Sequence, residues 1–178
     1  YVEPGVLEHE RSRGFGRSWQ VVARADELAA VGAYVTAEIA GEPVLVVRAE
    51  AGDPGLRAYF NVCPHRAGPV ARGCGRRKQL QCGYHGWTFS LEGKLLRAPE
   101  SEGCDLTGVG LTPISVARWG PLVFAAIEPA APLAEVVAGI AEPPASLAWV
   151  MRRDYELSAN WKVYVDNYLE GYHIPIVH

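Results

Sequence analysis

The sequence predicts a mainly β protein whose body is a small antiparallel sandwich or barrel. Three observations predict this fold class. Short runs rich in β-branched and aromatic residues follow one another closely, turn chemistry such as Asp53-Pro54-Gly55 separates them, and helical spacing becomes prominent only near the C-terminus. The predicted strands are residues 34–39, 43–48, 56–62, 79–82, 88–90, 114–118 and 122–126.

The segments around these strands have different patterns. Residues 7–19 are charged and interrupted by two glycines, so we expect a helical or irregular lead-in. One short helical turn is predicted at 25–31, ending at Gly32. Residues 91–94, Leu-Glu-Gly-Lys, have the composition of a hairpin turn.

The C-terminal part changes character. Residues 129–144 are rich in Ala, Pro and Glu and predict a connector with one helix at 133–140. Ser158 can cap a helix that begins at Ala159. Pro175 is expected to end that helix, because a proline inside a helix removes a hydrogen bond.

Composition and charge narrow the class of protein. The 178 residues are 49% hydrophobic and 21% charged, which suits a folded globular chain. A net charge of −3 argues against nucleic-acid binding, and no apolar run is long enough to span a membrane. Four cysteines do not form a dense secreted framework, so we expect a cytoplasmic location. Because the sequence begins at Tyr1 rather than Met, we expect a segment of a longer chain.

Two short motifs contain one thiol and one imidazole each. Cys63-Pro64-His65 is followed, after sixteen residues, by Cys82-Gly83-Tyr84-His85. Zinc accepts two thiolates and two imidazoles, but zinc fingers place two cysteines first and two histidines second. Alternating halves suit a [2Fe–2S] cluster with both cysteines on one iron and both histidines on the other. A structural zinc site remains the alternative.

This spacing resembles the Rieske cluster motif, and the resemblance covers residues 17–128. It implies a Rieske-type antiparallel β-sandwich with two cluster-binding loops. Rieske proteins of respiratory complexes carry an extra cysteine in each loop, where this sequence has Gly68 and Tyr84. The chain therefore resembles the oxygenase and ferredoxin branch. Cys74 and Cys104 lack ligand spacing and are expected to be ordinary thiols.

A second constellation lies near the C-terminus. On a helix, Asp166, Glu170 and His173 fall at i, i+4 and i+7 and share one face. His178 follows Pro175, so its ring is expected to turn back toward His173. Two histidines in this arrangement can supply two corners of a 2-His-1-carboxylate iron site.

Residues 160–178 resemble the opening of the catalytic domain in Rieske non-haem iron oxygenase α subunits of the aromatic-ring-hydroxylating dioxygenase type. The resemblance implies an α+β helix-grip domain, of which this is the first helix, and a mononuclear Fe(II) whose third, carboxylate ligand lies beyond residue 178. It assigns Glu170 to electron transfer from a neighbouring subunit's cluster, although the family usually has Asp there and Glu in some relatives acting on quaternary amines. Asn167 matches a family asparagine near the iron; for Asn167 and Asp166, helix-surface polarity is the alternative.

The combined prediction is a terminal oxygenase component. The expected parts are residues 1–16 as lead-in, 17–128 as Rieske domain, 129–153 as connector and 154–178 as the incomplete catalytic domain. The resemblance implies a [2Fe–2S] Rieske cluster, a mononuclear Fe(II), O₂, and an aromatic or related small organic substrate.

Further implied partners are a flavoprotein reductase, with or without a ferredoxin, and other copies of the chain in a trimer-type homo-oligomer with electron transfer between subunits. The alternatives are a stand-alone Rieske ferredoxin and a zinc protein. The iron content of the purified protein separates the three.

Overall fold

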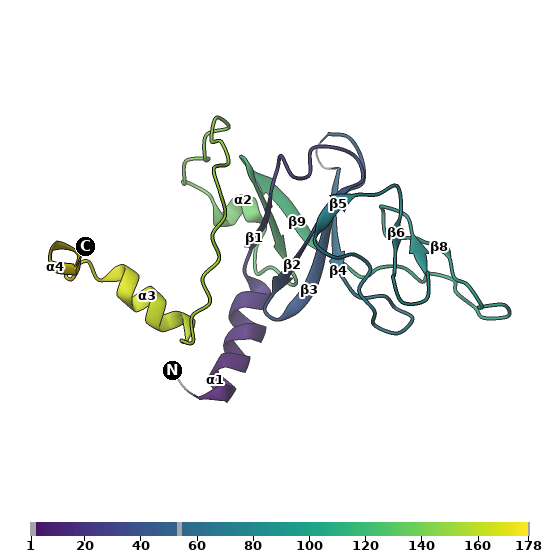
Figure 1. Cartoon of the computed structure of the whole chain (residues 1–178), viewed down its shortest axis with the longest axis horizontal. Helices are drawn as coiled ribbons and strands as arrows, with labels where there is room; N and C mark the ends of the chain where they lie inside the picture. Colours follow the sequence, from purple (N-terminus) through teal and green to yellow (C-terminus); the bar gives the residue numbers. More distant parts are fainter. Residues whose placement is uncertain (1–2, 53–54, 178) are drawn as a thin grey trace.

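The computed structural model describes residues 3–52 and 55–177, and it confirms the predicted mainly β fold class. The chain starts with a helical lead-in, as expected. Helix α1 (Pro4–His9) continues into a π-helical turn (Glu10–Gly14) and a 3₁₀ turn (Phe15–Arg17). Helix α1 lies below the sheet edge in Figure 1.

Within the described residues, seven strands form one curled antiparallel sheet. Their order is β1-β10-β9-β4-β3-β2-β5, so each neighbour in the sheet is joined by a hydrogen-bonded ladder. The strands are β1 (Gln20–Arg24), β2 (Ala33–Ile39), β3 (Glu42–Arg48), β4 (Leu56–Phe60), β5 (Cys74–Arg76), β9 (Pro113–Trp119) and β10 (Leu122–Ala126).

Strand β3 is the centre of the fold because both of its faces are buried. Val44 and Val46 pack into one hydrophobic cluster, whereas Leu45 and Val47 pack into the other. None of the four side chains is more than 1% exposed. Alternate residues of a strand point to opposite faces, so a continuous apolar run places side chains in two cores at once. Each such burial contributes about 1.5–3 kcal/mol.

A second, smaller sheet forms one end of the molecule. It contains β6 (Leu80–Gln81), β7 (Thr88–Phe89) and β8 (Leu95–Arg97) in sequential order. Phe89 and Leu80 are fully buried and pack in the same cluster as Leu45. The first core therefore joins the small sheet to the large one.

The sequence located most of the strands but not all of them. All seven predicted strands exist, within a residue or two of their predicted ends, and residues 91–94 do connect β7 to β8. Strands β1, β5 and β8 were not predicted. Residues 25–31, where a helical turn was expected, form non-helical turns. Helix α2 covers only Leu133–Val136 rather than 133–140. Gly139 has a positive φ of 79°, which ends that helical segment early.

The predicted C-terminal helix is interrupted. Helix α3 (Trp161–Leu169) is capped by Asn160, whose side-chain oxygen accepts a hydrogen bond from the Lys162 amide at 3.0 Å, rather than by Ser158. Glu170 follows with extended backbone angles. A separate short helix, α4, spans Ile174–Val177, so Pro175 lies inside it rather than ending α3.

The shared helix face expected for Asp166, Glu170 and His173 is therefore wrong. Of these three residues, only Asp166 lies on α3; Glu170 ends it, and His173 lies in the turn that follows Gly171. The chain changes direction there because glycine loses more conformational freedom in a helix than other residues do, and the next segment starts a new helix around Pro175.

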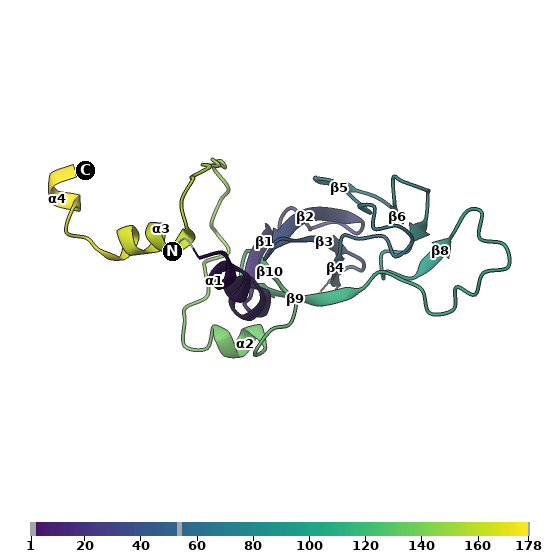
Figure 2. The same cartoon turned by 90° about the horizontal axis from the view of Figure 1, so that it is seen from below.

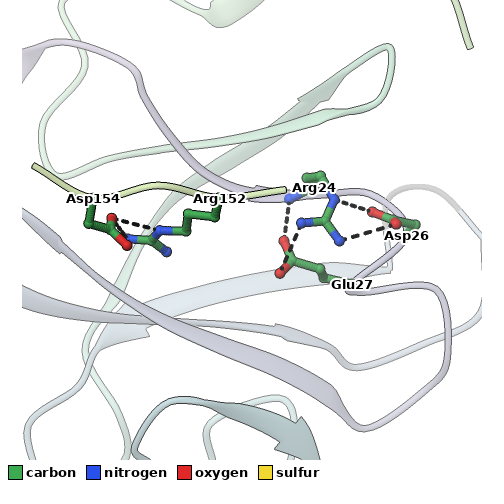
Figure 3. Close-up of polar contacts among 5 residues, drawn as sticks. All are labelled: Arg24, Asp26, Glu27, Arg152 and Asp154. Carbon is green, nitrogen blue, oxygen red and sulfur yellow. Dashed lines mark hydrogen bonds and ion pairs between the residues drawn. The ribbon is translucent and has the colours of Figure 1, made fainter. Parts of the chain in front are cut away.

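The connector after β10 is attached to the N-terminal part of the chain. The Trp19 indole donates to the Ala131 carbonyl at 2.8 Å, and the Trp149 ring lies 4.2 Å from the Arg24 guanidinium. Arg24 is itself held between Asp26 and Glu27, with an Nε–Oδ1 distance of 2.9 Å to Asp26 (Figure 3). These contacts fix where the connector leaves the sheet.

The two C-terminal helices and the small sheet lie at opposite ends of the molecule. Figures 1 and 2 both show α3 and α4 beyond the β1 and α1 side, with β6 and β8 at the far end. Helix α3 is joined to the lead-in by Glu10, which accepts hydrogen bonds from Lys162 and from the Trp161 indole, and by an edge-to-face contact of Phe15 with Trp161.

Candidate metal centre

The two cysteine loops have the same backbone structure. In the first, the Cys63 N–H donates to the Gly68 carbonyl at 2.9 Å, and the Ala67 N–H donates to the Cys63 carbonyl at 2.9 Å. In the second, the Cys82 N–H donates to the Trp87 carbonyl at 2.9 Å and the Gly86 N–H to the Cys82 carbonyl at 3.1 Å. Each loop is thus one turn closed by two hydrogen bonds, from the cysteine to the fifth residue after it.

Both turns need a left-handed residue at the same place. Four residues after each cysteine, Ala67 has a φ of 53° and Gly86 a φ of 73°. Glycine adopts this conformation without strain, whereas alanine does so at a cost. The repetition shows that the two loops are structural copies, although their histidines are two and three residues after the cysteine.

Asn61 holds the first loop in place from below. Its side-chain oxygen accepts hydrogen bonds from the Val70 and Ala71 amides, both at 3.0 Å, and its Nδ2 donates to the Ala71 carbonyl at 2.8 Å. Asn61 is only 6% exposed. A buried amide with all three partners satisfied fixes the returning arm of the loop relative to β4.

The two thiols lie together inside the fold. Cys63 and Cys82 are each 2% exposed, and they belong to the first hydrophobic core. Burial raises the pKa of the Cys63 thiol, and the neighbouring Cys82 raises it further, whereas the backbone N–H groups of His65 and Arg66 oppose the shift. A metal ion favours the thiolate and so displaces the proton.

The two imidazoles lie together at the surface. The rings of His65 and His85 are 4.7 Å apart, centre to centre, and both residues are exposed. His65 stacks flat on the buried Trp87 at 4.8 Å, and His85 lies 3.8 Å from the Tyr84 ring. Desolvation, followed by the charges of His85 and Arg66, lowers the pKa of His65, which favours the neutral ring that binds metal.

This pairing fits a [2Fe–2S] cluster. Thiols on the buried side and imidazoles on the exposed side give each of two irons a matched pair of protein ligands. Among residues 3–52 and 55–177, no group of three or more His, Cys, Asp or Glu side chains is arranged to hold a single ion. The structure thus brings Cys63 close to Cys82 and His65 close to His85, on two loops at one end of the molecule.

The second predicted set is only partly described. His173 Nδ1 contacts Glu170 Oε1, while Glu170 Oε2 accepts a hydrogen bond from the Tyr172 amide at 2.9 Å. The contact with His173 is the main cause that lowers the pKa of Glu170. A carboxylate that orients a ring nitrogen is typical of metal-binding histidines.

The other predicted residues of this set do not share a helix face with His173, because α3 ends before it. Asp166 and Asn167 are exposed on α3, and His178 lies outside the described residues. Glu170 and His173 are in direct contact.

Two contributors were not predicted from the sequence. Asn61 was not singled out, although a polar residue directly after an apolar strand and two residues before a ligand cysteine is a usable signal. Trp87 was not singled out either, and its ring supports His65. The spacing of residues in the sequence does not show which residues become hydrogen-bond or stacking partners in the fold.

Comparison with known proteins identifies the family. Residues 18–114 match the family model described as Rieske [2Fe-2S] domain. The chain belongs to the Rieske family. Its cofactor is a Rieske cluster, and the loop geometry described above suits it. Residues 144–178 of this Rieske chain match a second model, ring hydroxylating alpha subunit (catalytic domain), whose members also hold a mononuclear iron.

The Rieske chain is similar to monooxygenases over its whole length. It is 34% identical to choline monooxygenase of Amaranthus tricolor, covering 100% of this chain and 43% of that protein, and 36% identical to the carnitine monooxygenase oxygenase subunit of Escherichia coli, covering 100% and 50%. The crystal structure of the quaternary ammonium Rieske monooxygenase CntA with an inhibitor superposes with a TM-score of 0.87 at 34% identity, over 100% of this chain and 52% of that one. The chain thus spans about half the length of the relatives it matches.

Proposed function

We propose that this chain is the N-terminal part of the oxygenase component of a Rieske monooxygenase. In this proposal Cys63, His65, Cys82 and His85 hold the cluster, and His173 with His178 ligate the mononuclear iron. The observation that carries it is the pair of copied loops with thiols inside and imidazoles outside, in one chain with a segment similar to the oxygenase catalytic domain. A stand-alone ferredoxin needs no such second segment.

The residues of the two loops have defined tasks in this proposal. When bound, the cluster supplies storage of one electron and the iron supplies activation of O₂. Trp87 fixes the plane of His65 by stacking, and Asn61 fixes the loop that carries Cys63. The burial of both thiols excludes water from the sulfur side. Glu170 holds His173 through Nδ1, which leaves Nε2 as the nitrogen that can face a metal.

A quaternary ammonium compound is the substrate class that we propose. Relatives at 34–36% identity are named for choline and carnitine. The aromatic substrate expected from the sequence has weaker support, since naphthalene 1,2-dioxygenase matches with a TM-score of 0.69 at 28% identity and over 77% of this chain. The overall reaction would consume the substrate, O₂, NAD(P)H and one proton, and it would release the hydroxylated product, water and NAD(P)⁺.

Electron transfer between subunits is part of the proposal. The two candidate centres lie at opposite ends of the chain in Figures 1 and 2. A trimer-type ring of identical chains can bring the cluster end of one copy to the iron end of the next. One matched structure of a quaternary ammonium Rieske monooxygenase is described as revealing inter-subunit electron transfer. A flavoprotein reductase, with or without a ferredoxin, would supply the electrons.

The division of the chain and its location stay predictions. We retain residues 17–128 as the cluster domain, 129–153 as connector and 154–178 as the start of the catalytic domain. None of the described helices is long and apolar enough to cross a membrane. A cytoplasmic location is proposed, although the plant relatives are named as chloroplastic proteins.

The full-length protein tests this proposal. Three irons and two labile sulfides per chain are expected, and with a reductase and NADH the oxygen uptake should depend on choline or carnitine. Two irons with no substrate-dependent oxygen uptake would favour a ferredoxin, and zinc a structural protein. Uptake driven by naphthalene instead of carnitine would overturn the substrate class but not the oxygenase.

A further inference from the structure

The charges of this chain are unevenly distributed. Although the net charge is −3, the described stretch 55–91 contains six cations and no Asp or Glu. Five of the six lie within thirteen residues between the two ligand cysteines: Arg66, Arg72, Arg76, Arg77 and Lys78. All five are exposed. The cluster end of an acidic protein is therefore locally basic.

Two of these five cations, Arg76 and Arg77, have recorded contacts, and these contacts leave their charges uncompensated. Arg76 Nε donates to the Val31 carbonyl at 2.9 Å, and the Arg77 guanidinium lies 5.2 Å from the centre of the Tyr34 ring. Neither contact cancels a charge. None of the ion pairs recorded among the described residues involves a side chain from 66–78. An array of fixed, uncompensated charges attracts an oppositely charged partner from a distance.

A hollow beside the thiols lies within this basic region. It has a volume of about 400 Å³ and is lined by Arg72, Arg77 and Tyr84 together with Gly68. Gly68 lies against that thiol, because a Cβ atom added to it would be 3.2 Å from the Cys82 sulfur. Tyr84, 62% exposed, forms its rim.

The imidazole side has a different hollow with a different charge. That hollow, about 830 Å³, is lined by His65, His85, Arg66 and Glu100. The loop that carries Glu100 also presents Glu102 and Asp105, both exposed. The two faces of the cluster end are thus chemically distinct.

From this arrangement we propose that the Arg72–Arg77 hollow is the docking site of an acidic electron-donor protein, so that electrons enter on the thiol side and leave on the imidazole side. This proposal rests on the cluster assignment made above. In each encounter the donor loses one electron and this chain gains one, and no bond forms or breaks. Separate hollows for entry and exit let the donor dock while the imidazole side faces another subunit.

A protein donor fits better than a nucleic acid. A nucleic acid is negatively charged along its whole length. The carboxylates on the loop beside the imidazole-side hollow, Glu100, Glu102 and Asp105, would therefore repel it. A folded donor can present a local acidic patch to the arginines and avoid that loop.

The test uses the full-length holoprotein and, as probe, a reduced acidic plant-type [2Fe–2S] ferredoxin. Stopped-flow absorbance gives the second-order rate constant of cluster reduction, and surface plasmon resonance gives the Kd of the oxidised ferredoxin for the oxidised holoprotein. The rate constant of the unmodified protein should fall steeply between low and high salt. Replacing Arg72→Glu and Arg77→Glu together should lower it at least tenfold at low salt and weaken the Kd by a similar factor.

Matched controls separate the two proposals. Arg11→Glu with Arg13→Glu makes the same charge change at the opposite end and should leave both readouts unchanged. A small uncharged photoreductant should reduce the cluster equally in every variant. Absence of the cluster's visible absorption would contradict the proposed function itself. A normal cluster with unchanged rate constant and Kd in the Arg72/Arg77 variant would overturn the docking site alone. The milder variants Arg72→Gln and Arg77→Gln should give smaller losses in the same direction.

Discussion

At the scale of single residues, the centre depends on groups that are not ligands. Asn61 satisfies two amides and one carbonyl of the first loop with one side chain. Trp87 supplies a flat surface for His65. Both lie in or next to the hydrophobic core, so the positions of exposed rings are determined by buried contacts.

Replacing Asn61→Ala should destabilise the apoprotein by at least about 2 kcal/mol. Each buried polar group left without a partner costs about 1–3 kcal/mol, and this substitution leaves three. Urea unfolding measures the loss. Asn167→Ala, on the exposed face of α3, is the control and should change the unfolding free energy by less than about 0.5 kcal/mol. Equal effects of the two variants would contradict the loop-clamping role.

Replacing Cys82→Ser should abolish the visible absorption and the low-g electron resonance signal of the cluster. A serine hydroxyl does not ionise at neutral pH and is a poor ligand for iron in this setting. Cys74→Ser and Cys104→Ser, at exposed free thiols, should leave both signals intact. A normal spectrum in the Cys82 variant would remove it from the ligand set.

At the scale of elements, the two loops allow a paired test. Gly86→Ala should destabilise the protein by about 1 kcal/mol, because it places a Cβ on a left-handed residue. Ala67→Gly, at the equivalent place in the first loop, relieves the same strain and should be neutral or stabilising. Thermal unfolding of both variants checks this. Changes of the same sign would mean that the loops are not equivalent.

The contact between the π-helical turn at Glu10 and α3 should depend on pH. The hydrogen bond from Lys162, followed by that from Trp161, lowers the pKa of Glu10 below its usual 4.5. The folded state therefore binds fewer protons at Glu10 than the unfolded state, so the contact stabilises fully above about pH 4.5 and weakens as the pH falls through the lowered value.

Protection factors from hydrogen exchange across 161–169 should accordingly drop below about pH 4.5. In Glu10→Gln, protection should already be low at neutral pH and should vary little with pH. An acid-induced drop of equal size in the Gln variant would assign the effect to another group.

Elements were predictable from the sequence to the extent that their signal is local. The apolar run 43–48 identifies β3 because both faces of that strand are buried. Strand β5, Cys74–Arg76, has only exposed residues and exists because it pairs with β2 at the sheet edge. The break after Leu169 was missed because i, i+4 and i+7 spacing was given more weight than Gly171. The candidate cluster ligands stand out in the sequence because Cys and His at this fixed spacing have few other uses.

At the scale of the whole molecule, the distance between the two ends makes the assembly a testable requirement. Full-length Cys82→Ser lacks a working cluster, and full-length His173→Ala lacks an iron ligand, so each should be inactive alone. When the two are dissociated and reassembled together, about a quarter of normal activity should return, because half of the clusters and half of the iron sites are intact and combine across a cyclic interface. Persistent inactivity of mixed assemblies would place the transfer within one chain.

The burial of β3 on both faces also determines how the protein unfolds. Leu45 and Val47 face the core that contains the thiols, and Val44 and Val46 face the core of the main sheet. A molecule that has lost its metal cannot loosen one end and keep the other, since the same strand would lose half of its packing. Damage at the cluster would instead spread into one cooperative unfolding event and uncover an aliphatic segment that cellular proteases can cleave. A chain without its cofactor would then be removed rather than persist as an inactive competitor in the assembly.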